Sequence, residues 1–166
     1  MKETYISAHI SYTEATRSSY AKRHGIPNVP TKRQIGVMRA LAEGLFEPIR
    51  EHFNTPIYIS SFFRGSELNE AIGGATYSDH MVRGSIAAID IDQDAIGSSV
   101  TNADIFYYIL ENMDYHKLIW EFGDDNNPAW VHVSYSKLPE DNKRRITLIA
   151  ERKSGRTHYR PFKKDF

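Results

Sequence analysis

The chain has 166 residues, of which 40% are hydrophobic and 25% charged, and its formal net charge is zero. These values are typical of one soluble globular domain with its own core, and they argue against a protein that binds polyanions through bulk charge. The chain contains no cysteine, which excludes disulfide bonds, thiolate metal sites and cysteine nucleophiles. Any metal must therefore be held by histidine and carboxylate side chains.

The two ends of the chain differ from its middle. We expect one domain over residues 1–166, with a turn-rich N-terminal extension at 1–30 and a basic C-terminal strand and tail at 143–166. The latter segment carries nine Lys or Arg against two acids. Such a run is usually a solvated face, but it could also attract anionic cell-wall polymers, nucleic acid or a partner protein. The lack of ordered basic–aromatic spacing disfavours nucleic acid.

The start of the chain also bears on where it acts. Its first fifteen residues contain no apolar core of signal-peptide length, and no window of the chain approaches a membrane span. We therefore expect a chain without a signal peptide or a membrane span, which the usual route does not export.

Helical and strand patterns predict an α+β fold with a small, mainly antiparallel sheet and flanking helices. Thr31 is expected to cap a long amphipathic helix over residues 32–53, and Pro48 should kink its last turns. A short helix is predicted over 66–72, and Asn102 is expected to cap another that runs to about residue 112. Five strands are predicted, at 57–61, 85–92, 117–122, 129–135 and 145–152.

The second and fourth predicted strands each turn apolar residues to one face and polar residues to the other. Asp90 and Asp92 share the polar face of the second strand, and His132 lies on that of the fourth. If the two strands are neighbours, Asp90 and His132 point into one cleft, which His80 enters from the preceding loop. Two imidazoles and one carboxylate are the ligands of a catalytic zinc site with an open position for water. The spacing alone leaves open that these are ordinary polar cleft residues.

Five short segments follow one another between about Glu47 and Tyr135. They are Ser60–Asn69 (SSFFRGSELN), Gly73–Ala75 (GGA), Ser78–His80 (SDH), Ala88–Ile91 (AIDI) and Trp130–Ser134 (WVHVS). In this order they resemble the M15 family of zinc peptidases, which includes D-alanyl-D-alanine carboxypeptidases and phage peptidoglycan endopeptidases, and in particular the family's phage-associated branch. The resemblance covers over half of the chain and implies a fold like that of Hedgehog domains and D,D-peptidases.

Position by position, the resemblance implies that His80, Asp90 and His132 are zinc ligands. Zinc in such a site lowers the pKa of its bound water and polarises a carbonyl, which are the two requirements of amide hydrolysis. Arg64 corresponds to the family's substrate-binding arginine, which holds a carboxylate or polarises a carbonyl, and a planar guanidinium suits a carboxylate. Ser78 is placed with the substrate-binding residues and fixes the loop that carries His80.

The chain departs from the family in two places. The family's aspartate usually follows the histidine by about seven residues, whereas Asp90 follows His80 by ten, so Asp92 is an alternative ligand. Many members place the general base three residues before the last histidine, where this chain has Ala129. A Glu-Phe-Gly segment of the phage-associated branch matches residues 121–123. Glu121 is therefore the candidate base, with the alternatives Asp124 and Asp125.

The resemblance as a whole implies a zinc metallopeptidase that cuts bacterial peptidoglycan, as a D,D-carboxypeptidase or an endopeptidase. A phage-type lysis enzyme is the expected setting, which would act in the host cytoplasm and then the cell wall, or in the virion. The alternative is a catalytically inactive M15-like binding or virion structural module, which Ala129 and the long His80–Asp90 gap suggest. The sequence makes no prediction of the oligomeric state.

Overall fold

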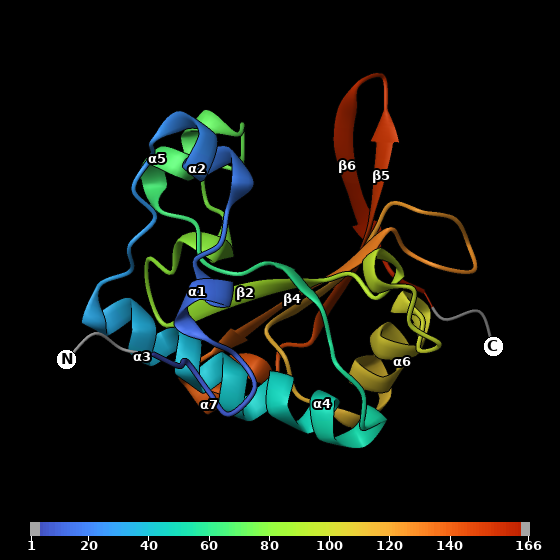
Figure 1. Ribbon diagram of the computed structural model, residues 1–166. Coiled ribbons are helices and arrows are strands. Elements are labelled where there is room, and N and C mark those ends of the chain that lie inside the picture. Colours follow the sequence, from blue (N-terminus) through green and yellow to red (C-terminus); the bar gives the residue numbers. More distant parts are fainter. Residues whose placement is uncertain (1–3, 164–166) are drawn as a thin grey trace.

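The computed structural model of the chain describes residues 4–163, and within them a six-stranded sheet is flanked by helices (Figure 1). The strand order is β1-β2-β4-β3-β5-β6, and every neighbouring pair is antiparallel except the parallel pair β3–β5. The predicted α+β class is confirmed. The strands are β1 (Ile59–Ser61), β2 (Ile86–Ile91), β3 (Lys117–Glu121), β4 (Trp130–Ser136), β5 (Ile146–Lys153) and β6 (Arg156–Pro161).

The sixth strand, β6, and the parallel pairing of β5 are absent from the sequence prediction. What was expected to be a single basic strand with a tail is a hairpin, β5–β6, that rises from the sheet. The last three residues of that predicted tail, 164–166, lie outside the described residues.

The helices are short except for α6 and the long helix that follows Thr31. None of those within residues 4–163 is long and apolar enough to span a bilayer. They are α1 (Tyr12–Ala15), α2 (Ser19–His24), α3 (Lys32–Leu41), the π-helical η1 (Ala42–Phe46), α4 (Glu47–Phe53), α5 (Ser66–Ala71), the 3₁₀ turns η2 (Asp79–Met81) and η3 (Asp94–Ile96), α6 (Asn102–Asn112) and α7 (Pro139–Asn142).

The long helix begins where it was predicted. Thr31 caps it and forms a capping box with Gln34: each residue's side-chain oxygen accepts a hydrogen bond from the backbone N–H of the other. Pro48 cannot donate a backbone hydrogen bond, and the helix widens into the π turn η1 directly before it, where Glu47 N donates to the Ala42 carbonyl. The structure thus accommodates the proline by a π turn within one continuous helix.

The helices α3, α4 and α6 cover one face of the sheet, below it in Figure 1. The face they cover carries the apolar residues of the central strands, among them Ile89, Val131 and Val133, all of which are fully buried. On the opposite side, α2 and α5 rise beyond one edge of the sheet and the β5–β6 hairpin beyond the other (Figure 1). The polar face of the sheet thus lies between α2 and α5 on one side and the β5–β6 hairpin on the other.

Part of the predicted N-terminal extension belongs to the core. Ile6 and Ile10 are buried in the same cluster as the sheet residues. The Ala15 carbonyl accepts from Phe63 N at 2.9 Å, and Arg17 Nη2 donates to the Ile59 carbonyl at 2.9 Å. The N-terminal segment therefore holds β1 and the residues that follow it.

The predicted cap of α6 is wrong by one residue. Thr101 is the N-cap and forms a capping box with Asp104, whereas Asn102 is the first helical residue and is fully buried. Asn102 Oδ1 accepts from Gln93 N at 2.7 Å, and its Nδ2 donates to the Pro128 carbonyl at 3.1 Å. Asn102 therefore joins the loop after β2 to the loop before β4, because a threonine one residue earlier already supplies the cap.

Candidate functional site

The sheet register brings two of the predicted site residues together. Asp90 on β2 lies directly opposite His132 on β4, and Asp90 Oδ1 is 2.9 Å from His132 Nδ1. Both side chains lie on the face of the sheet that the helices leave uncovered, as the alternation of each strand requires. The two strands are thus neighbours, and Asp90 and His132 line one cleft.

His80 reaches the same point from the 3₁₀ turn η2, and its side chain is buried. His80 Nδ1 lies 2.7 Å from the Phe62 carbonyl, so this nitrogen carries the proton and donates it. His80 Nε2 then keeps its lone pair, lies 3.2 Å from Asp90 Oδ2 and has no hydrogen-bond partner among the described residues. A buried imidazole lone pair without a donor, held by a carbonyl on its other nitrogen, is the arrangement of a metal ligand.

The charges of the cluster also fit a cation. Burial lowers the pKa of His80, although Asp90 opposes this, so the imidazole is neutral near pH 7. Burial alone would raise the pKa of Asp90, but the two imidazoles outweigh it and hold that pKa well below its usual range. Candidate ligand atoms of the three side chains lie within 4.8 Å of one another. Two imidazoles and one carboxylate fit a divalent metal such as zinc and leave a coordination position open.

The long gap between His80 and Asp90 is accommodated in a loop at 82–85. Arg33, in the first turn of α3, donates to three carbonyls of this loop, at 2.7 Å to Gly84, 2.8 Å to Val82 and 3.1 Å to Arg83. Val82 itself is buried with a φ of 52°, a conformation that a β-branched residue rarely adopts. The loop is thus bonded to α3, and His80 and Asp90 still meet His132 in one cluster despite the long gap.

The alternative ligand Asp92 lies outside the cluster. The strand β2 ends at Ile91, and Asp92 Oδ1 accepts from Ala95 N and from Asn102 Nδ2, both at 3.3 Å. Its carboxylate therefore serves the turn η3 and the start of α6. The geometry favours Asp90 over Asp92 as the carboxylate of the cluster.

Glu121 enters the same cleft at the end of β3, and only 7% of its surface is exposed. Burial is the main cause that raises the pKa of Glu121 to about 7; His132 and Arg64 oppose the rise, and Asp90 adds to it. A carboxyl group with a pKa near neutrality can both accept and return a proton. Ala129 is its backbone neighbour, since Ala129 N donates to the Glu121 carbonyl at 2.9 Å.

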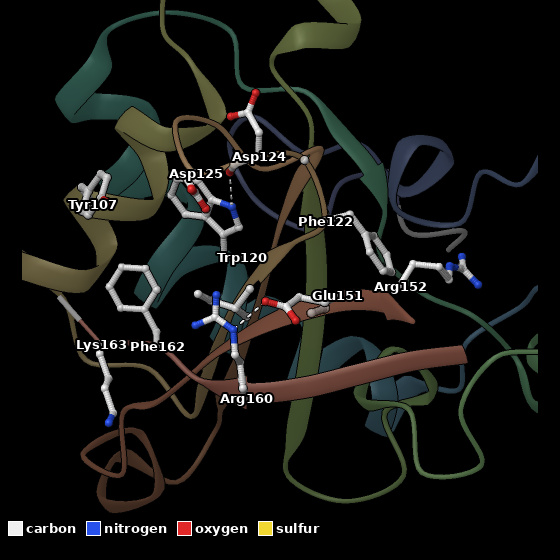
Figure 2. Close-up of a pocket in the computed structure, with 13 residues that line it drawn as sticks. Tyr107, Trp120, Phe122, Asp124, Asp125, Glu151, Arg152, Arg160, Phe162 and Lys163 are labelled. Atoms are coloured by element: carbon white, nitrogen blue, oxygen red, sulfur yellow. Dashed lines mark hydrogen bonds and ion pairs between the residues drawn. The ribbon is translucent and has the colours of Figure 1, made fainter. Parts of the chain in front are cut away.

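The two other candidate bases point elsewhere. Asp124 Oδ1 accepts from Asn126 N and Asn127 N and so stabilises the turn between β3 and β4. Asp124 and Asp125 line a neighbouring cavity of about 750 Å³ beside Trp120 and Phe162, which shares Phe122 and Arg152 with the cleft (Figure 2). Neither aspartate lines the cleft that holds the metal-binding cluster.

Arg64 and Ser78 both line this cleft. Arg64 Nη2 lies 3.9 Å from Asp90 Oδ2, and its Nε is buried without a hydrogen-bond partner among the described residues. Asn28 holds the backbone on either side of Arg64, because it donates to the Phe63 carbonyl at 3.0 Å and accepts from Gly65 N at 2.8 Å. The structure thus places a fixed guanidinium beside the metal-binding cluster.

The cleft has a volume of about 520 Å³, and the sequence did not predict one of its walls. Leu148 and Arg152 of β5 and Thr157 and Tyr159 of β6 line it. A signal for this hairpin does exist: Ser154-Gly155 forms its turn with φ of 51° and 75°, and Ser-Gly is a common turn dipeptide.

No curated protein matches the chain. The family described as Peptidase M15 matches residues 8–134, which include the metal-binding cluster, Arg64 and Glu121 and end before β5. More than half of the chain is matched, so this chain belongs to the M15 peptidase family, which implies a metallopeptidase.

Proposed function

We propose that the chain is a zinc-dependent peptidase that hydrolyses peptide bonds of bacterial peptidoglycan. The observation that carries this proposal is the convergence of His80, Asp90 and His132, with Glu121 in the same cleft. Zinc is the ion we infer, because imidazole and carboxylate in a three-ligand set are typical of catalytic zinc and the chain has no thiolate to offer.

The proposed reaction assigns roles to the bound zinc, Glu121, Arg64 and Ser78. Bound zinc would polarise the scissile carbonyl and make water more acidic. Glu121 accepts a proton from the attacking water and returns it to the leaving amine, for which its pKa of about 7 is suitable. Arg64 binds a substrate carboxylate or the polarised carbonyl oxygen, and its planar guanidinium allows two parallel hydrogen bonds. Ser78 lies at the cleft wall, with a hydroxyl that is available to the substrate.

The biological setting we propose is phage-type cell-wall lysis. The support is the segment Glu121-Phe122-Gly123, which resembles the phage-associated branch of the family. Phe122 and Gly123 both have positive φ, at 54° and 74°, so the chain turns sharply directly after the proposed base. In this setting the enzyme acts on the cell wall from the host cytoplasm or as part of the virion.

Zinc content and wall lysis test the proposal together. Purified parent protein should hold one zinc per chain, and His80→Ala should lose it. His158→Ala, which removes an exposed imidazole from β6, is the matched control and should keep it. A zinc content that is the same in the parent and His80→Ala would exclude this ligand set.

Turnover is tested with the zinc-loaded protein on purified peptidoglycan. We expect Glu121→Gln to keep zinc but to clear a wall suspension about 10²–10⁴-fold more slowly, because the general base is removed. Asp125→Asn makes the same chemical change outside the cleft and should clear at the parental rate. Release of single D-Ala residues would indicate a carboxypeptidase, and release of larger fragments an endopeptidase. A parent that holds zinc but clears nothing would instead support an inactive binding module.

A further inference from the structure

We infer that the β5–β6 hairpin is a substrate-recognition wall, in which Arg152 binds a second substrate carboxylate on the side of the scissile bond opposite Arg64. This inference rests on the proposed peptidase function and adds a specificity determinant to it. The hairpin follows the part of the chain that matches the family, residues 8–134.

The sheet register aims one face of the hairpin at the cleft. Ala150 pairs with Glu121 on one side and with Tyr159 on the other, so Tyr159 lies on the same face as the proposed base, two strands away. Arg152 and Thr157 form the next cross-strand pair on this face, and both line the cleft. The hairpin therefore extends, beyond β3, the face of the sheet that carries Glu121.

The other face of the hairpin is turned away. Glu151 and Arg160 lie on it, and Arg160 Nε is 2.6 Å from Glu151 Oε1. In Figure 2, Arg152 extends beside Phe122, apart from the Glu151–Arg160 pair. Glu151 also pairs with Lys153 Nζ at 2.9 Å. The acidic residue nearest to Arg152 in the sequence is thus neutralised by other cations.

The positive charge of Arg152 is not neutralised by a neighbouring carboxylate. It is exposed and forms no ion pair with any of residues 4–163. Its guanidinium lies over the ring of Phe122, with the Cζ atom 5.3 Å from the ring centroid, which orients the group at the edge of the cleft. By contrast, Lys117, another cation of the cleft, is paired with Asp79 at 3.1 Å. An oriented guanidinium without a carboxylate partner is suited to bind one from the substrate.

Tyr159 supplies the apolar part of the wall. Tyr159 is 55% exposed, and it lies on the same face of the sheet as Glu121, two strands away. An exposed aromatic ring that lines the same cleft as the proposed base offers a flat surface against which a peptide can pack. Tyr159 and Arg152 together would hold the part of the substrate that lies over β3 and β5.

The strand order then defines the class of substrate. Arg64 follows β1, Arg152 is on β5, and Asp90, His132 and Glu121 come from β2, β4 and β3 between them. A peptide bound across these strands meets one guanidinium on each side of the reacting bond. The preferred substrate is therefore a peptide with a free carboxylate on both sides of that bond, as stem peptides with unamidated carboxyl groups have.

Calorimetric titration of paired peptides tests the inference. The probes are a peptidoglycan stem peptide ending in D-Ala-D-Ala with all carboxyl groups free, and the same peptide with the α-carboxyl of its γ-linked glutamate amidated. The zinc-loaded Glu121→Gln protein serves as the parent, because it should bind without turnover. Arg152→Gln is compared with Arg156→Gln, which removes the same charge from the other face of the hairpin.

We expect the parent to bind the free peptide about tenfold more tightly than the amidated one, since one charge-assisted hydrogen-bonded pair is lost. Arg152→Gln should weaken binding of the free peptide about tenfold and remove this preference, whereas Arg156→Gln should keep it. The inference fails if Arg152→Gln and Arg156→Gln weaken binding of the free peptide equally, or if Arg152→Gln weakens binding of both peptides equally. Either result leaves the proposed peptidase function standing. If the parent binds neither peptide, the inference and the proposed function both fail.

Discussion

Asp90 and His132 face each other across the antiparallel pair β2–β4, with Asp90 Oδ1 and His132 Nδ1 2.9 Å apart. Two of the proposed ligands are thus fixed by a ladder of backbone hydrogen bonds in the middle of the sheet. The third, His80, comes from a short turn and a loop that depend on α3 for their position. The site should therefore be most sensitive to changes that loosen this loop.

The first prediction concerns Arg33, which donates to three carbonyls of the loop at 82–85. Arg33→Gln should lower the free energy of unfolding by about 1–3 kcal/mol, because three loop carbonyls, one of them on the buried Val82, lose a charged donor. It should also weaken zinc binding, since the turn that carries His80 becomes mobile. Thermal melting and competition with a chelator measure the two effects.

The matched control for Arg33 is Lys32→Gln, which removes an exposed positive charge from the adjacent position. Lys32→Gln should melt at the parental temperature and keep its zinc affinity. If Arg33→Gln unfolds at the parental temperature and binds zinc as tightly, the loop does not depend on α3 as described.

The second prediction concerns Asn28, whose side-chain amide bonds the backbone on both sides of Arg64. Asn28→Ala should leave the zinc content at one per chain, because no ligand is touched. Its peptidase activity should fall about tenfold, mainly through a higher KM, as Arg64 loses its fixed position. Steady-state kinetics on a soluble stem peptide separate KM from kcat.

Asn126→Ala is the control for Asn28, since it makes the same change in an exposed turn that lines neither the cleft nor the cluster. We expect parental KM and kcat for this variant. A fall in kcat with unchanged KM for Asn28→Ala would indicate that Arg64 acts on the transition state and does not position the bound substrate.

The third prediction is a pH dependence of stability in the metal-free protein. Burial raises the pKa of Glu121 from 4.5 to about 7 in the folded state. Its contribution to stability is complete below pH 4.5, where both states are protonated, and is lost as pH rises through 7, because the folded state must then hold a buried charge. Glu121→Gln removes this loss and should be more stable than the parent by about 3 kcal/mol at pH 8 but not at pH 4.

Denaturant unfolding at the two pH values measures this difference. Glu43→Gln, an exposed carboxyl on the helix η1, is the control and should differ little from the parent at both. A gain for Glu121→Gln that is the same at pH 4 and pH 8 would show that Glu121 is not held in a desolvated site.

Strong local patterns made much of the fold predictable from the sequence. The helix after Thr31 combines a cap with a long apolar stripe, and β2 and β4 alternate clearly enough to place Asp90 and His132 on one face. The strand β6 escaped prediction because all six of its side chains are exposed and show no apolar alternation. Burial on a single face is the usual signal of a strand, and this hairpin lacks it.

Alternation also failed where a strand ends. Parity along the strand places Asp92 on the face of Asp90, but β2 stops at Ile91 and the Asp92 side chain turns to Asn102. Likewise, the burial of Ile6 and Ile10 could not be predicted, because each lies in a short segment without any period. Both outcomes depend on tertiary contacts that no local pattern encodes.

Zinc content of two matched variants tests the central claim most directly. Asp90→Asn and Asp92→Asn make the same chemical change two residues apart, one inside the cluster and one outside it. Elemental analysis after dialysis should find one zinc per chain in the parent and in Asp92→Asn, and little or none in Asp90→Asn. Loss of zinc from Asp92→Asn with retention in Asp90→Asn would contradict the proposed metal centre.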